Sequence, residues 1–481
     1  MKRLGVYLKP YTLESILGPL FKLLEASFEL IVPLVMAAII DTGVANADRP
    51  YIMKMSLVLF LLALIGLTCA ITAQYFAAKA AVGCATGLRH ALFEHIETLS
   101  FTEMDTVGTS TLITRMTSDV NQVQNGVNLV LRLFLRSPFI VFGAMVMAFT
   151  IDVKAALVFV VTIPLLSVVV FGIMLVSIPL YKKVQAALDK VLGITRENLT
   201  GSRVIRAFNK EQDEIAQFHE DNEALTKIQL YVGKISALMN PLTYIIINGA
   251  IVVLVWVGAI RVDNGNITQG QVVALVSYMS QILVELIKLA NLIININKSI
   301  ACMNRIETVL DMESSITEHP AAETGSLTSD GAGREGKETI PAENAVVFSK
   351  VGLTYAGASE EALSDIDFTV RRGETIGIIG GTGSGKSSVV NLIPRFYDAT
   401  RGEVFVDGKN VRDYTLEELR AKVGVVLQKA VLFKGTIREN LSWGNSDATD
   451  EEMYEALETA QAREFVDAKE GGLSYEIEQG G

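Results

Sequence analysis

Residues 380–387 read Gly380-Gly381-Thr382-Gly383-Ser384-Gly385-Lys386-Ser387, which is the complete pattern of a phosphate-binding loop. The loop lies between an apolar run at 375–379, which predicts a buried strand, and residues 388–393, which predict a helix starting at Ser388. A strand, a glycine loop and a helix in this order turn backbone N–H groups toward phosphate oxygens. Lys386 is expected to reach the β- and γ-phosphates of a nucleotide, and the Ser387 hydroxyl to ligate Mg²⁺. Ser388, which follows directly, is expected to bind the nucleotide together with the loop residues 380–387.

Composition indicates a membrane protein with a water-soluble part. Half of the 481 residues are apolar and the mean hydropathy is +0.37, yet a fifth of the residues are charged. The net charge of −11 argues against a nucleic-acid partner, because such proteins present a basic surface. The three cysteines are scattered, which favours neither a disulfide framework nor a metal site.

Six apolar stretches precede the loop and predict six transmembrane helices, since a helix needs about 20 apolar residues to cross the hydrocarbon core. Four of them are uncharged over a length sufficient to span, which makes buried helices of a large soluble protein the weaker alternative. The stretches are 15–40, 55–78, 137–151 (extended by 131–135 around Arg132), 155–181, 235–260 and 264–284.

The distribution of basic residues predicts the orientation of these helices. Lysines and arginines concentrate in the long connections 79–127 and 182–234 rather than in the short ones near 41–55, 151–154 and 261–270. Positive charge stays on the cytoplasmic side, so both termini, the long connections and the nucleotide domain are expected there. The long connections lack proline over most of their length, which predicts helices that project far into the cytoplasm.

The organisation follows from these patterns: a membrane domain over 1–311, a linker over 312–344 and a nucleotide domain over 345–481. The linker is rich in Glu, Ser, Thr, Gly and Ala and has few large apolar residues to bury. Strand-like runs resume at 345–348 and 402–406. The predicted fold class is therefore a polytopic α-helical membrane domain with long cytoplasmic extensions, joined to an α/β P-loop NTPase domain.

With these motifs in place, the chain resembles one half of an ABC exporter of the multidrug-resistance type, over essentially its whole length. Residues 353–355 are similar to the family's A-loop, and 423–428 with 432–441 to its Q-loop region. Residues 108–119 and 197–211 are similar to segments near its coupling helices. The resemblance implies that Tyr355 stacks on adenine and that Gln428 touches Mg²⁺ or the attacking water. From the residues alone, the apolar run at 423–427 predicts a strand, which places the Gln428 amide at a strand end, where ligands of α/β folds collect. By position alone, Tyr355 also fits ordinary strand packing, and Gln428 also fits an ordinary loop residue.

The same resemblance implies a function and partners. It implies ATP-driven export of a drug, lipid or peptide across the cytoplasmic membrane, with ATP and Mg²⁺ as cofactors and lipids around the helices. The partner is expected to be a second half-transporter. A heterodimer is favoured over a homodimer, because residues 182–208 and 392–395 are similar to those of subunits of bacterial heterodimeric exporters. The alternative is an ATP-binding regulatory subunit with a degenerate site and no hydrolysis of its own.

The chain departs from the family at its C-terminus, where the sequence stops at Gly481. In the family, the signature motif, the Walker B carboxylates, the catalytic glutamate and the switch histidine follow this point. The expectation is therefore a truncated chain whose nucleotide domain is incomplete at its C-terminus. Such a chain has no catalytic residue and is expected to bind nucleotide without hydrolysing it.

Charged residues in the apolar stretches and at their ends also need partners or a cavity. Glu25 and Glu29 are four residues apart and share one helix face, where they could line a polar path or snorkel toward the cytoplasm. Glu285 and Lys288 are expected to pair with each other.

Overall fold

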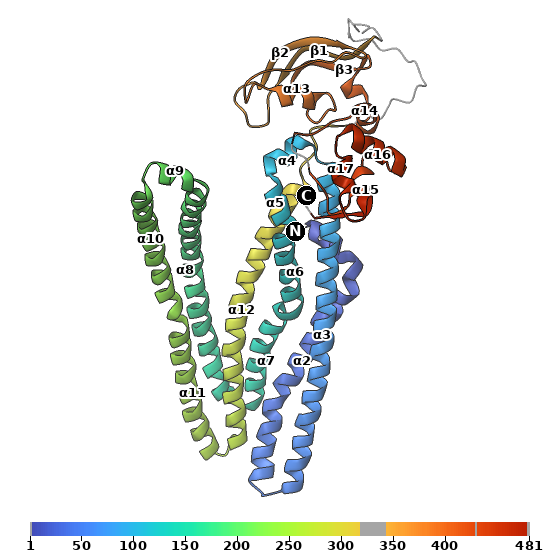
Figure 1. The fold of residues 1–481 in the computed structure, drawn as a ribbon. Helices are drawn as coiled ribbons and strands as arrows, with labels where there is room; N and C mark the ends of the chain where they lie inside the picture. Colours follow the sequence, from blue (N-terminus) through green and yellow to red (C-terminus); the bar gives the residue numbers. More distant parts are fainter. Residues whose placement is uncertain (1, 318–342, 429–430, 479–481) are drawn as a thin grey trace, which may run out of the picture. The chain divides into compact units, whose positions relative to one another are not determined.

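The computed structural model describes residues 2–317, 343–428 and 431–478 (Figure 1). The chain divides into two compact units, Met1–Ser315 and Ile316–Gly481, which are described separately below. Most of the linker predicted at 312–344 lies outside the described residues.

Six helical segments of the first unit are long and apolar enough to cross a membrane, which confirms the number predicted from the sequence. The 50-residue α3 is about 75 Å long at 1.5 Å per residue, more than twice the thickness of a hydrocarbon core. The helices of this unit are α1 (Lys2–Leu8), α2 (Thr12–Ala38), α3 (Arg49–Thr98), α4 (Phe101–Val107), α5 (Thr109–Thr114), α6 (Val120–Leu129), α7 (Arg136–Ile151), α8 (Val153–Thr200), α9 (Ser202–Ala207), α10 (Glu211–Ala237), α11 (Met239–Asp263) and α12 (Gln269–Leu310).

Three short turns join these helices in pairs at the end of the unit opposite α9 (Figure 1). The residue directly before the second helix of each pair is a capping residue: Asp48 for α3, Asp152 for α8 and Thr268 for α12. Each side chain accepts a hydrogen bond, 2.8 to 3.4 Å long, from the backbone N–H three residues later. A cap of this kind is worth about 1 kcal/mol, because it satisfies an N–H group that the helix leaves without a partner.

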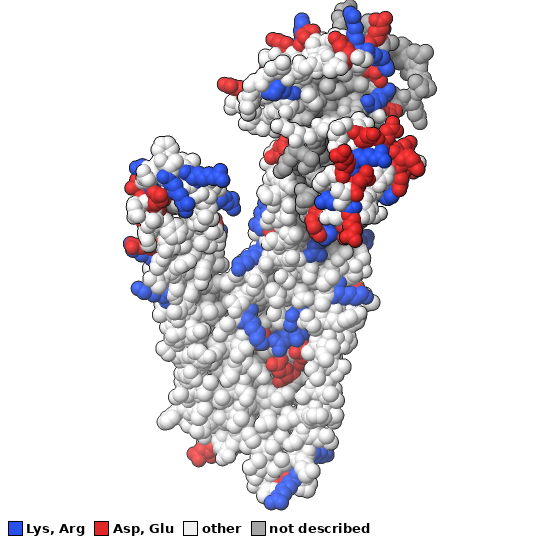
Figure 2. Space-filling view, viewed as in Figure 1, with Lys and Arg blue, Asp and Glu red and all other residues white. Residues whose placement is uncertain are grey.

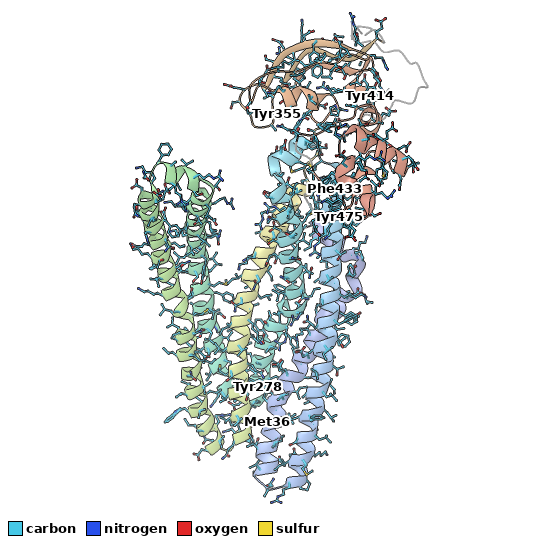
Figure 3. All side chains as sticks on the ribbon, viewed as in Figure 1. Met36, Tyr278, Tyr355, Tyr414, Phe433 and Tyr475 are labelled. Carbon is cyan, nitrogen blue, oxygen red and sulfur yellow. The ribbon has the colours of Figure 1, made fainter. Side chains whose placement is uncertain are left out.

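Small residues and one buried hydroxyl hold the helices of this unit together. Ala73, Ala77 and Ala80 of α3 are fully buried, and Gly18 of α2 packs against this stripe, so the two backbones approach closely. Tyr278 of α12, labelled in Figure 3, donates a hydrogen bond of 2.6 Å to the carbonyl of Leu30 in α2. Without water between helices, such contacts take the place of the hydrophobic effect.

The second unit is built on an antiparallel sheet with the strand order β2-β1-β3-β4. At its centre Phe348 of β1 is paired with Phe368 of β2, and their rings stack 4.6 Å apart. The strands are β1 (Asn344–Leu353), β2 (Leu363–Arg371), β3 (Arg401–Val406), β4 (Lys409–Asn410) and the pair β5 (Gly435–Thr436) and β6 (Glu476–Ile477), and the helices are α13 (Lys386–Leu392), α14 (Leu416–Lys422), α15 (Ile437–Leu441), α16 (Asp450–Thr459) and α17 (Arg463–Asp467).

Two strands predicted from the sequence are wrong. Residues 375–379 and 423–427 form no strand, and Ile379 and Val426 are 98% and 99% exposed. A buried parallel strand depends on hydrogen bonds from neighbouring strands and on helices that cover both faces of its sheet. Within the described sheets neither segment has a neighbouring strand, so apolar composition alone does not give it a strand conformation.

Asp152 combines its capping role with an ion pair to Arg261 of α11, whose Nε lies 3.0 Å from the carboxylate. Burial alone would raise the pKa of Asp152. The hydrogen bonds from Arg261 and from the N–H of Ala155 outweigh burial and hold the pKa below its ordinary value. The carboxylate is therefore ionised at neutral pH and links two helix ends.

We expect Asp152→Ala to destabilise the protein by about 1 kcal/mol more than Asp152→Asn, because asparagine still caps α8 but cannot form the ion pair. The folded-state pKa is lowered, so the stabilisation from the charge is fully present above the unfolded pKa of about 3.9. It is lost as the pH falls through the lower folded value. Thermal unfolding in detergent at neutral and acidic pH measures this. Identical midpoints for all three proteins at neutral pH would contradict it.

Candidate nucleotide-binding site

Two glycines give the loop at 380–387 its shape. Gly383 and Gly385 have φ angles of 83° and 85°, in the left-handed region that side chains disfavour. A Cβ at Gly385 would also lie 2.6 Å from a side-chain carbon of Leu363. Position 385 therefore requires glycine, because its φ angle is in the left-handed region and because Leu363 of β2 approaches it closely.

Lys386 places its ammonium group inside this loop. Its Nζ donates hydrogen bonds of 2.9 Å and 2.7 Å to the carbonyl oxygens of Gly380 and Gly381, and lies 3.3 Å from the Ser384 hydroxyl. The cation is thus enclosed by the backbone that the motif predicts will surround phosphate. A positive charge held there suits phosphate oxygens, which form strong charge-assisted hydrogen bonds with ammonium groups.

Helix α13 begins directly after the loop, at Lys386. Ser388, Val389 and Leu392 are buried, and the two apolar side chains pack into the core under the sheet. Ser387 remains exposed beside the loop. The buried face fixes the helix, and the first turn presents its N–H groups and the Ser387 hydroxyl on the loop side.

Tyr355 is joined to the loop region by a hydrogen bond. Its hydroxyl donates to Oγ of Ser388 over 2.8 Å, and its ring packs edge-on against Tyr397, with ring centroids 5.2 Å apart. Figure 3 shows Tyr355 beside α13. The structure therefore brings together two residues that the sequence placed in the site, 33 positions apart. The ring also contacts the core cluster, so the packing role weighed from the sequence is present too.

Three other residues predicted for the site are exposed to solvent. Thr382 and Gly381 are exposed at its tip. Gln428 is also exposed and lies in an irregular segment, next to residues 429–430, which the structure does not describe. In the described parts of the chain no hydrogen bond connects Gln428 to the loop, so its role as a ligand stays a prediction.

Sequence reasoning missed Tyr397, which orients the ring of Tyr355. Its neighbour Arg395 is 3% exposed, has a φ of 54° and pairs with Asp398 at 2.8 Å, so the turn after α13 is fixed by an ion pair. The only indication of Tyr397 in the sequence is that an aromatic residue occurs in the polar turn after the predicted helix. That indication does not show that its ring packs against Tyr355.

The chemical groups at this site are those that bind a nucleotide phosphate together with Mg²⁺. Lys386 supplies a cation, Ser387 an exposed hydroxyl, and the left-handed glycines leave backbone room for phosphate oxygens. Among the residues that the structure describes, no cluster of three or more His, Cys, Asp or Glu side chains is placed to hold a metal ion. A metal here would therefore depend on hydroxyl, amide and phosphate oxygens, which Mg²⁺ accepts.

Comparisons with known proteins match both units. A family described as "ABC transporter transmembrane region" matches residues 15–286, and one described as "ABC transporter" matches residues 363–477. An uncharacterized ABC transporter ATP-binding protein of Mycobacterium tuberculosis is 34% identical over 99% of this chain and 80% of its own length.

Two further relatives have names that state an activity. A Bacillus subtilis ATP-binding/permease protein named for multidrug export is 31% identical over 97% of this chain and 79% of its own length. An ATP-dependent lipid A-core flippase of Desulfotalea psychrophila is 30% identical over 81% of this chain and 65% of its own length.

Tyr355 offers a direct test of the site. We expect Tyr355→Ala to weaken binding of a fluorescent ATP analogue about 5- to 150-fold, because base–aromatic stacking is worth about 1–3 kcal/mol. Tyr355→Trp should largely retain binding, and Tyr355→Phe should lose only the hydrogen bond to Ser388. Equal affinity of the alanine variant and the unmodified protein would contradict the assignment.

Proposed function

Because the chain belongs to the ABC transporter family, we propose that it acts as half of a dimeric exporter, using ATP to move a substrate across the cytoplasmic membrane. The observation that carries the proposal is the hydrogen bond from the Tyr355 hydroxyl to Oγ of Ser388. It connects an aromatic side chain to α13, the helix that follows the phosphate loop. This site is fused in one chain to six helices long enough to cross a membrane.

In this proposal each site residue has a stated role toward ATP. The Tyr355 ring supports the adenine, and Lys386 binds the β- and γ-phosphates with the backbone N–H groups of 380–385. Ser388 holds the Tyr355 hydroxyl and contacts the phosphates from the first turn of α13. Ser387 and Gln428 would hold Mg²⁺, which neutralises phosphate charge when bound.

The basic residues support the proposed orientation. Lysines and arginines concentrate in the long connections, which include α4 and α9, so we place these connections and the nucleotide unit in the cytoplasm. The partner is proposed to be a second half-transporter, a heterodimer being favoured by the resemblance of 182–208 and 392–395. The names of the relatives support a drug or a lipid as the substrate class.

Lys386→Ala tests the proposal. Removing the cation should weaken ATP-analogue binding about 10- to 150-fold, because hydrogen bonds to charged groups are worth about 1.5–3 kcal/mol. The matched control is Lys422→Ala, which removes an exposed lysine of the same unit whose Nζ lies 3.1 Å from the Asp407 carboxylate. The measurement is equilibrium binding to the purified full chain in nanodiscs.

Transport in cells that carry the chain with its partner half is the second measurement. Export should be lost with Lys386→Ala and retained with Lys422→Ala. Unchanged ATP affinity in Lys386→Ala would refute the site. ATP binding that depends on Lys386, with no effect of either variant on export, would favour a regulatory subunit instead.

A further inference from the structure

Helix α4 lies at the end of the first unit where α12 finishes and where Figure 1 marks the N-terminus. Figure 2, in the same view, shows that the surface along the long helices is mostly uncharged, so α4 lies beyond the part that hydrocarbon would cover. A hydrogen bond in water competes with solvent, so a lasting contact there needs buried groups. One such contact joins α4 to the start of the predicted linker.

Glu103, in the first turn of α4, takes part in a helix cap. Its Oε2 accepts a hydrogen bond of 3.1 Å from the backbone N–H of Ser100 and a second one from the Ser100 hydroxyl. The Ser100 side chain caps the helix in return, which completes a capping box. A capping box is built from neighbouring residues and needs one carboxylate oxygen. It therefore accounts for Oε2 of Glu103 and not for Oε1.

The second oxygen of Glu103 binds a residue 212 positions later in the chain. Oε1 accepts a hydrogen bond of 3.2 Å from the backbone N–H of Ser315, and Oγ of Ser315 lies 2.9 Å from Oγ of Ser100. Ser315 follows the end of α12 and is the last residue of the first unit. The start of the segment predicted as a linker is thus held on α4.

The carboxylate at this contact is buried and charged. Glu103 and Ser100 are 9% and 8% exposed. Burial raises the pKa of Glu103, but the hydrogen bonds from Ser100 and Ser315 outweigh burial and hold the pKa below its ordinary value. Release of Ser315 would take a donor from a buried, ionised oxygen, which is costly. The contact is therefore suited to persist rather than to exchange with water.

Two other elements hold the last turns of α12. Arg305 of α12 donates from Nε to Asp119 over 3.0 Å, and Asp119, directly before α6, is 3% exposed. Arg3 of α1 donates from Nη1 to the carbonyl of Leu310, the last residue of α12, over 3.0 Å. The end of α12 is therefore fixed within the unit, and the contact at Ser315 extends this hold to the chain that follows.

We propose that Glu103 is a positioning residue for ATP-driven export: it fixes the start of the linker to α4, so that a displacement of the linker moves α4 and α12 together. The chain passes from Ser315 into the second unit, so the contact sets where that connection begins. Without it, the free connection would begin at the end of α12 and would be longer and less direct. The proposal rests on the export function proposed above and adds a residue outside the nucleotide site.

A disulfide tests the contact itself. Because the two Oγ atoms are 2.9 Å apart, Ser100→Cys combined with Ser315→Cys should form a disulfide on oxidation with copper phenanthroline. The matched control combines Ser100→Cys with Ser314→Cys, and the three native cysteines are buried. In the full chain in nanodiscs without nucleotide, the first pair should oxidise about tenfold faster, measured as loss of thiols that react with maleimide. Equal rates would overturn the contact.

Ser315→Asp tests the coupling. It places a second carboxylate beside Glu103 and leaves the capping box intact, and Ser314→Asp is the matched control with the same charge. The measurement is the change in hydrogen–deuterium exchange of α4 and α12 on saturation with an ATP analogue, in the chain assembled with its partner half. Ser315→Asp should reduce this change at least about fivefold. An equal response of the two aspartate variants would remove Glu103 from the coupling.

A rescue separates this role from capping alone. Glu103→Ala loses both the cap and the contact, whereas a disulfide between positions 100 and 315 restores only the contact. When Glu103→Ala is combined with Ser100→Cys and Ser315→Cys, the oxidised protein should recover the exchange response and the reduced protein should not. No recovery on oxidation would make Glu103 a capping residue only and overturn the proposal.

Failure of the export function gives a different result. An unmodified assembly with no exchange response to the ATP analogue would overturn the export function together with the coupling role of Glu103. The oxidation rates are measured without nucleotide, so they would still report the contact between α4 and the linker.

Discussion

The absence of water from hydrocarbon is the constraint on which this structure depends. Every backbone polar group inside a bilayer must be satisfied within its own helix, and every side-chain charge needs a partner. The first unit meets the first demand with six long helices and capped turns. It meets the second with the pair between Arg136 and Glu285, which removes two charges from lipid by placing each against the other.

The nucleotide unit follows a different rule, because it works in water on a highly charged ligand. Its loop depends on backbone conformations that only glycine adopts easily, at Gly383 and Gly385, and on a lysine enclosed by carbonyl oxygens. The core below the loop fixes α13, and the Tyr355 hydroxyl holds the aromatic residue to that helix. Rigid support on one side and exposed donors on the other are what a phosphate site needs.

The sequence predicted what local pattern controls. Six apolar stretches, the helix at α13 and the strands at β1 and β3 are all present, because each depends on composition and periodicity over one segment. The pairing of Glu285 with Lys288 was also confirmed, since they are three residues apart on one helix. For Glu25 and Glu29, the sequence is compatible both with a polar path and with snorkelling toward the cytoplasm. The structure pairs Glu25 with Lys22 and Glu29 with Arg136, 107 positions away in the chain.

The failures have one physical cause, which is dependence on distant partners. Residues 375–379 and 423–427 look like strands but need neighbouring strands to become so, and Ile379 and Val426 are exposed instead. Tyr397 could not be linked to Tyr355, nor Arg136 to Glu285, because these contacts join different elements. Gln428 directly follows 423–427 and is exposed in an irregular segment, so its position relative to the loop could not be predicted from that segment either.

The central claim is that one chain couples ATP binding in its second unit to substrate binding in its first. The most direct measurement is the affinity for an ATP analogue with and without a saturating transported substrate, made on the chain assembled with its partner half. Coupling requires that the substrate change the ATP affinity and that ATP change the substrate affinity by the same factor. The account predicts equal factors of about 5 to 150. Two affinities that are each independent of the other ligand would contradict it.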